Sequence, residues 1–213
     1  MHICNARVRF VVQLLLATCS TLFDQMSSAA GVRAVRSLLE IRQQNVVIQQ
    51  FDLSCGAAAL ATLLRFQHGE TITERDVATG LMRRDAYLAD PDLIRQHQGF
   101  SLRDLKRFVQ SRGYDGAGYG GMQLDDLNQQ APLMVPLSVH GYQHFVIFRG
   151  VVGNHAVLAD PAWGNRTMPI DEFLQAWSDD PQIGRVGFVI KVRETSAANN
   201  LLAPRPDDFV LLK

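Results

Sequence analysis

The sequence contains the stretch Ser54-Cys-Gly-Ala-Ala-Ala-Leu-Ala-Thr-Leu-Leu64, which decides the first half of the fold. Its leucines recur at helical spacing and its alanines permit close packing, so we predict a helix from about Cys55 to His68. Gly69 then ends the helix, because glycine is common just beyond a helix C-terminus. The predicted helix therefore begins at a cysteine.

That cysteine has the placement of a nucleophile. The unpaired N–H groups and the positive dipole end at a helix start favour a thiolate, and Ser54 is a candidate N-cap. Gly56 and the alanines after it leave the thiol reachable. A free cysteine is more often an inert, buried hydrophobic residue. The position of Cys55 at the head of the helix nevertheless predicts a reactive thiol.

A histidine and an aspartate in the second half of the chain can complete this site. His144 opens the apolar run 144–148, a predicted strand, and Asp160 ends the next predicted strand. A hairpin between these strands, turning at 153–154, would bring the two side chains together. We predict that His144 is the general base and that Asp160 orients its ring, although an Asp before Pro is also a common turn residue. Other histidines compete for the role of base: His68, His140 and His155.

A side-chain amide can supply the remaining group, a hydrogen-bond donor to the oxyanion. Gln49 lies six residues before Cys55, and a loop of that length can return the amide beside the backbone N–H of Cys55. Two such donors would stabilise an oxyanion by roughly 3 kcal/mol each. Gln50 is the neighbouring candidate, and only one of the pair would face the site. A thiol, an imidazole, a carboxylate and an amide together predict a cysteine hydrolase.

A zinc site is the alternative for the same residues. His140 and His144 are four residues apart, and Cys55 and Asp160 also carry groups that can bind zinc. Histidines at this spacing share a face only on a helix, whereas Gly141 and the flanking β-rich runs predict extended chain. We therefore expect no metal and no other cofactor.

The composition limits the partners. The chain has 213 residues, of which 47% are hydrophobic and 20% charged, which suits one globular domain with a real core. Lys and Arg together number 21, as do Asp and Glu, so the formal net charge is zero. Nucleic acids and anionic membrane surfaces attract clustered positive charge, and we expect neither as a partner.

The N-terminus predicts export. Basic residues are followed by an apolar run over residues 8–17 and by small residues at 27–30, the pattern of a signal peptide cleaved after Ala30. The run is too short for a stable membrane anchor. Cys4 and Cys19 lie inside this segment, so an exported protein would keep only Cys55 and could form no internal disulfide. A first amphipathic helix is the alternative; we expect a periplasmic or exported protein.

The order of the predicted elements indicates an α+β domain. Thr73-Glu-Arg-Asp76 and Ser101-Leu-Arg-Asp104 resemble capping boxes that begin two further helices, and a short helix follows at 123–127. Strands are predicted at 133–139, 144–148, 155–159 and 186–192, with a short helix at 171–177. Helices first and an antiparallel sheet afterwards define the α+β class.

We divide the chain into a signal peptide at 1–30, one domain at 31–193 and a loose C-terminal tail at 194–213. Within the domain, residues 45–50 are predicted to be extended. Residues 82–99 are charged and weakly patterned, and we interpret them as an insertion or a mobile helix-loop near the site.

The chain resembles the bacteriocin-processing, double-glycine leader peptidases of the papain-like clan. The resemblance covers residues 46–192 and rests on five short motifs in this order: Gln49-x5-Cys55-Gly56, Ala58 and Leu60, Gly99-Phe-Ser-Leu-Arg-Asp-Leu105, His144-Phe-Val, and Asp160-Pro161. It implies a papain-like fold, in which the helical half carries the Cys and the sheet half carries the His and Asp. It also implies the four roles already assigned to Cys55, His144, Asp160 and Gln49.

The chain departs from transporter-fused members of that family. It carries no predicted membrane span and no ATPase, Ser54 stands where an acidic residue is common, and 82–99 is longer than usual. It is similar instead to stand-alone exported members, among them the peptidase of Fap-type functional-amyloid secretion systems. The resemblance implies a polypeptide substrate, such as a secretion-system component. The rival functions are an amidase or acyltransferase on the same scaffold and a non-catalytic module that binds leader peptides.

Overall fold

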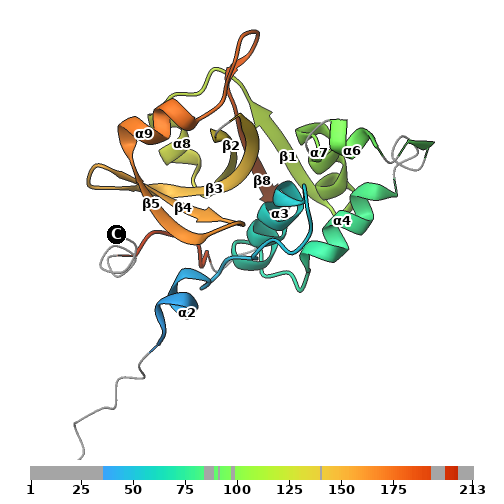
Figure 1. Ribbon diagram of the computed structural model, residues 1–213, viewed down its shortest axis with the longest axis horizontal. Coiled ribbons are helices and arrows are strands. Elements are labelled where there is room, and N and C mark those ends of the chain that lie inside the picture. Colours follow the sequence, from blue (N-terminus) through green and yellow to red (C-terminus); the bar gives the residue numbers. More distant parts are fainter. Residues whose placement is uncertain are drawn as a thin grey trace, which may run out of the picture. The chain divides into compact units, whose positions relative to one another are not determined.

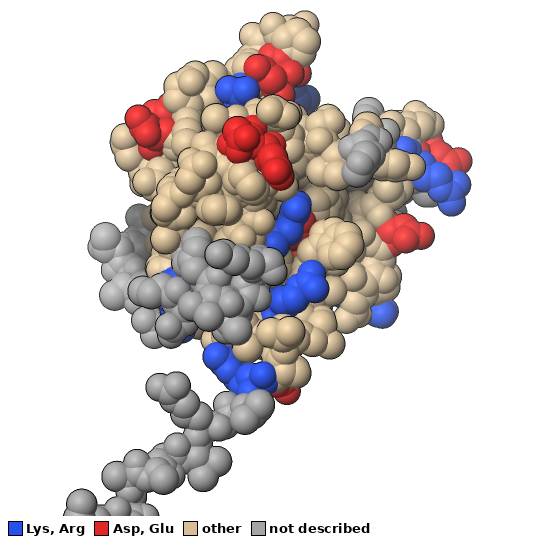
Figure 2. Space-filling view, turned by 60° about the vertical axis from the view of Figure 1, so that its left-hand side comes forward, with Lys and Arg blue, Asp and Glu red and all other residues tan. Residues whose placement is uncertain are grey.

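The computed structural model describes residues 36–83, 89–90, 92–96, 99–139, 141–192 and 200–205. The predicted signal peptide, His140 and much of the 82–99 segment lie outside these residues. No helix in the described part is long and apolar enough to cross a bilayer. Figure 2 shows acidic and basic side chains interspersed on the visible face, in keeping with the net charge of zero.

An antiparallel sheet of six strands, in the order β1-β8-β2-β3-β4-β5, forms the centre of the fold (Figure 1). Its strands are β1 (Tyr114–Tyr119), β2 (Leu133–Val139), β3 (Tyr142–Val152), β4 (His155–Asp160), β5 (Gly164–Pro169) and β8 (Gly187–Val192). Two short strands, β6 (Asp179–Asp180) and β7 (Gly184–Arg185), pair separately. The predicted antiparallel sheet is confirmed.

Helices cover both faces of the sheet. They are α2 (Leu38–Arg42), α3 (Cys55–Phe66), α4 (Glu74–Met82), α6 (Leu93–Gln96), α7 (Leu102–Ser111), α8 (Leu124–Gln130) and α9 (Ile170–Ala176). Alternate strand residues supply two apolar clusters: Met134 and Ile147 pack with α3, α4 and α7, whereas Val135 and Phe148 pack with α8 and α9. Figure 1 shows these two groups of helices on opposite sides of the sheet. The predicted α+β class is confirmed.

Helix α3, which begins at Cys55, is deeply buried. Every residue from Cys55 to Leu64 is buried, so this helix lies inside the core and is not buried along one face alone. Its small alanines permit close packing, and both α4 and β3 contact it. The helix ends at Phe66, two residues before the predicted end, and Gly69 adopts a φ of 75° in the turn that follows.

The two predicted capping boxes are confirmed. Thr73 and Asp76 satisfy each other's backbone N–H groups at the start of α4, and Ser101 and Asp104 do the same at the start of α7. The predicted helix at 123–127 forms as α8 but continues to Gln130.

Strands β1 and β5 were not predicted. β1 is Tyr-Asp-Gly-Ala-Gly-Tyr, whose glycines argue against a strand by propensity. A Cβ at Gly116 would lie 2.7 Å from Val109 and 2.9 Å from Phe188, so glycine permits α7 and β8 to pack closely against β1. Residues 45–50, predicted to be extended, form no strand.

The C-terminal segment differs from the loose tail that we expected. Within the described residues 200–205, Leu202 is completely buried, and the buried guanidinium of Arg149 donates to the carbonyl groups of Leu202 and Ala203. Arg149 also donates to Asn165 Oδ1 at 2.6 Å. This segment therefore packs against the sheet, because it supplies acceptors that a buried arginine requires.

Candidate active site

The loop before α3 presents Cys55 as the first residue of the helix. Ser54 is the N-cap residue of α3, as predicted, but its side chain makes no capping hydrogen bond. Its hydroxyl instead lies 2.6 Å from the carbonyl oxygen of Phe51 and also donates to the carboxylate of Glu74. The backbone of Ser54 has φ −99° and ψ 12°, not the extended conformation that directs a capping side chain toward the helix.

The β3–β4 hairpin brings His144 and Asp160 together. The strands pair as Val152 with His155 near the turn, and the register shifts by one residue between Phe148 and Gly150. Beyond this bulge the register sets Asp160 opposite Val146, on the same face of the hairpin as His144. The Nε2 atom of His144 lies 2.7 Å from Oδ1 of Asp160. The predicted hairpin thus forms and joins the two side chains.

Asp160 is completely buried and has three partners. Besides His144, the backbone N–H of Ala162 donates to Oδ1 at 2.8 Å, and Nε of Arg166 lies 2.8 Å from Oδ2 in an ion pair. Burial acts to raise the pKa of Asp160, but the hydrogen bond and charge of His144, the charge of Arg166 and the Ala162 N–H together hold that pKa below its usual value. Asp160 is therefore a carboxylate at neutral pH.

The imidazole of His144 is held in its charged form. Burial acts to lower its pKa, but hydrogen bonds and charge interactions with Asp160 and Cys55 outweigh burial and raise the pKa from 6.5 to about 9. Because Nε2 is engaged by Asp160, Nδ1 is the ring nitrogen left for Cys55. The imidazole therefore interacts with both the carboxylate and the thiol, and all three groups line one cleft.

Gln49, and not Gln50, shares a cleft with these residues. The cleft has a volume of about 650 Å³ and is lined by Cys55, His144, Asp160 and Gln49, together with Leu53, Tyr142, Trp163 and Arg166. The Nε2 group of Gln49 donates to the carbonyl oxygen of Phe51 at 2.8 Å, and the backbone N–H of Gln49 donates to Pro161. All four predicted site residues therefore meet in one cleft.

Two of the competing histidines, His68 and His155, do not line this cleft. The ring of His68 packs against Tyr114, with 5.1 Å between ring centroids, and His155 begins β4 at the turn end of the hairpin. His140, on which the zinc alternative depends, lies outside the described residues.

Arg166 is a site residue that the sequence did not reveal. It lies on β5 opposite Leu158 of β4, a position that sets it on the same face as Asp160. Strand β5 was not predicted, so nothing along the chain connected this arginine with the carboxylate. Strands are predicted from an apolar pattern, and β5 has none because the residues of Gly164–Pro169 are largely polar.

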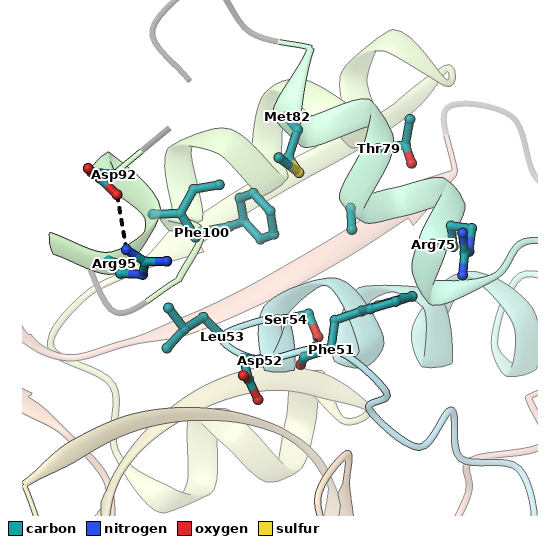
Figure 3. A pocket seen from close by; sticks show the side chains of 12 residues that line it. Phe51, Asp52, Leu53, Ser54, Arg75, Thr79, Met82, Asp92, Arg95 and Phe100 are labelled. Carbon is teal, nitrogen blue, oxygen red and sulfur yellow. Dashed lines mark hydrogen bonds and ion pairs between the residues drawn. The ribbon is translucent and has the colours of Figure 1, made fainter. Parts of the chain in front are cut away.

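A second pocket lies beside the cleft and shares Leu53 with it. It has a volume of about 520 Å³ and lies between the loop before α3, helix α4 and the segment that contains α6 (Figure 3). Its apolar lining is formed by Phe51, Leu53, Ala78, Met82, Ile94 and Phe100. Charged side chains surround this lining, including the ion pair of Arg95 with Asp92.

Comparison with known proteins identifies the family. Residues 43–180 match the peptidase C39 family. The chain is 37% identical over 174 residues to the "Probable functional amyloid protease FapD" of Pseudomonas aeruginosa, a match that covers 81% of this chain and 71% of that protein.

Two solved structures share the fold. A double glycine motif protease from an AMS/PCAT transporter, in complex with the leader peptide, has a TM-score of 0.54 and 21% identity, covering 69% of this chain and 90% of that one. The peptidase domain of Streptococcus ComA has a TM-score of 0.55 and 17% identity, covering 70% and 100%. These structures confirm the papain-like α+β fold that the resemblance implied. The family match and the identity to the Pseudomonas protein show that this chain belongs to the peptidase C39 family and is a cysteine peptidase.

Proposed function

We propose that this protein is an exported cysteine peptidase that hydrolyses a peptide bond in a secreted polypeptide or in a component of an export system. The observation that carries the proposal is the position of His144, which lines the same cleft as Cys55 and whose Nε2 atom lies 2.7 Å from Asp160. This combination of groups is the one that nucleophilic catalysis by a thiol requires.

In the proposed reaction, the thiolate of Cys55 attacks the carbonyl carbon of the peptide bond, and the carbonyl oxygen takes up the electron pair. The imidazolium of His144 then gives its proton to the leaving amine as the C–N bond breaks. Water attacks the thioester that remains, neutral His144 accepts a proton from that water, and the thiolate leaves. Asp160 stays ionised throughout and keeps the ring in place.

Gln49 is the proposed side-chain donor to the oxyanion. A primary amide carries two N–H hydrogens, and the bond to Phe51 uses one of them. This bond fixes the amide plane, so the second hydrogen has a defined direction. The backbone N–H of Cys55, at the start of α3, is the proposed second donor.

The apolar pocket beside the cleft supports a polypeptide substrate. Its apolar residues and charged surroundings suit an amphipathic segment of a chain whose scissile bond lies in the neighbouring cleft (Figure 3). One similar protein is named a functional amyloid protease, and one similar structure holds a leader peptide. Both names favour a polypeptide substrate over a small-amide substrate.

The first prediction concerns the nucleophile. Cys55→Ala should abolish cleavage of fluorogenic peptides while circular dichroism shows an unchanged fold. In the wild type, iodoacetamide near neutral pH should alkylate Cys55 rapidly, and His144→Ala should slow that reaction, as mass spectrometry would show. Testing peptide, isopeptide and small-amide substrates in parallel separates a peptidase from an amidase or acyltransferase. Equal cleavage by wild type and Cys55→Ala would refute the assignment.

The pH dependence of activity tests the pairing of His144 with Asp160. His144 must be protonated to give its proton to the leaving amine, so kcat/KM should fall as pH rises through about 9. Asp160→Asn removes the main partner that raises this pKa, and the falling limb should move toward the ordinary value of 6.5. Asp125→Asn, an exposed change on α8, is the control and should leave the limb in place. An alkaline limb that does not move in Asp160→Asn would contradict the proposed pair.

The pocket assignment predicts an effect on substrate affinity. Met82→Glu places a charge in the apolar lining and should raise KM by about tenfold, with kcat little changed, for a synthetic peptide that carries an amphipathic helix ahead of the cleaved bond. Val152→Glu, at the turn end of β3, is a matched control at a partly exposed valine. An unchanged KM in Met82→Glu would show that the substrate docks elsewhere.

Export can be measured directly. A protein expressed from Met1 should be recovered from the periplasm without residues 1–30, and mass spectrometry should find Gly31 as its first residue. Recovery of the intact chain from the cytoplasm would overturn this part of the proposal.

A further inference from the structure

We propose that Glu74 is a positioning residue for the oxyanion hole, acting through the loop that carries Gln49. This inference rests on the proposed function, because it concerns how one of the catalytic groups is held in place. Glu74 is the first residue of α4, 19 residues after Cys55, and only 4% of its surface is exposed.

The buried carboxylate of Glu74 faces the loop before α3. It accepts hydrogen bonds from the backbone N–H groups of Gln50, at 2.9 Å and 3.2 Å to its two oxygens, and of Phe51, at 3.4 Å. The hydroxyl of Ser54 also donates to it. Three residues of one short loop therefore converge on one carboxylate, which offsets the cost of burying its charge.

These bonds continue to the catalytic amide. The carbonyl oxygen of Phe51 accepts from Nε2 of Gln49 at 2.8 Å and lies 2.6 Å from the hydroxyl of Ser54. Glu74 bonds the backbone N–H groups of Gln50 and Phe51, which come just before that carbonyl group in the chain. It thereby holds in place the carbonyl oxygen of Phe51, which sets the direction of the Gln49 amide. A shift of the 50–51 backbone would move the amide away from the oxyanion position.

Helix capping does not account for this arrangement. An acidic residue in the first turn of a helix is favourable in general, but Thr73 and Asp76 already form a complete capping box at the start of α4. The Glu74 carboxylate bonds to groups 20 to 24 residues away in the chain. Its contacts thus tie α4 to the loop.

The loop conformation itself requires such a restraint. Leu53 adopts a φ of 61°, in the left-handed region that a leucine rarely occupies. Such a conformation persists only where the surroundings hold it, and the bonds from Glu74 to Gln50, Phe51 and Ser54 flank Leu53 on both sides.

The test is Glu74→Gln, which keeps the shape of the side chain but replaces one acceptor oxygen with a donor. We expect kcat to fall by about tenfold or more against the fluorogenic peptide that the wild type cleaves, with KM changed less than twofold. Alkylation of Cys55 by iodoacetamide needs no oxyanion hole, so its rate should stay within about twofold of the wild-type rate. This difference distinguishes loss of the oxyanion donor from loss of the nucleophile.

Asp76→Asn is the matched control. It makes the same carboxylate-to-amide change in the first turn of the same helix, but the Asp76 carboxylate bonds to the backbone N–H and the hydroxyl of Thr73, at the start of that helix. We expect it to lower the melting temperature and leave kcat unchanged. If Glu74→Gln behaves like Asp76→Asn, with reduced stability and normal kcat, Glu74 is merely structural and the inference fails.

Ser54→Ala provides a second variant, and its kcat tests the inference by itself if Glu74→Gln does not fold. It removes one donor to the carboxylate and should lower kcat by a smaller factor. Where Glu74→Gln does fold, the two losses should not multiply in the double variant. A normal kcat in Ser54→Ala, or losses that multiply, would contradict a shared action through the loop. Cleavage by the wild type in the same assay tests the proposed function itself. If the wild type cleaves and the variants behave otherwise than expected, only the role of Glu74 is refuted.

Discussion

The site depends on the contact between His144 and Asp160 across the β3–β4 hairpin. The contact exists because a bulge shifts the strand register by one residue, and without that shift the two side chains would lie on opposite faces. Arg149 lies at the bulge, and its guanidinium is anchored by Asn165 and by the carbonyl groups of residues 202 and 203. The C-terminal segment thus helps to hold the register on which the pairing of His144 with Asp160 depends.

The cleft is assembled where two halves of the domain meet. The loop that carries Gln49 is held on the sheet side by the bond from its backbone N–H to Pro161, which directly follows Asp160. On the helical side, Glu74 of α4 holds the next residues of the same loop. Because the bond to Pro161 adjoins Asp160, the position of the Gln49 amide is coupled to the position of the Asp160 carboxylate.

Local signals predicted much of this arrangement. The start of α3 at Cys55, the two capping boxes and the β3–β4 hairpin each depend on neighbours a few residues apart, and each was predicted correctly. Ser54 takes the predicted N-cap position but makes no capping bond, because its backbone is not extended and its hydroxyl is directed to Glu74, 20 residues away. Polar and glycine-rich strands were missed because their pairing is stabilised by tertiary packing and not by propensity.

The amino-acid sequence alone determined the chemistry of this protein: which thiol, imidazole, carboxylate and amide are available, and on which kinds of element they lie. Only the tertiary structure decided their partners. Arg166 reaches Asp160 from a strand without an apolar pattern, and Glu74 reaches the loop from another helix. The physical reason is that periodicity and capping act within one turn or one hairpin. Buried charged groups find their partners only when distant segments pack together. Away from water, each such group then needs a hydrogen bond or an opposite charge from another segment.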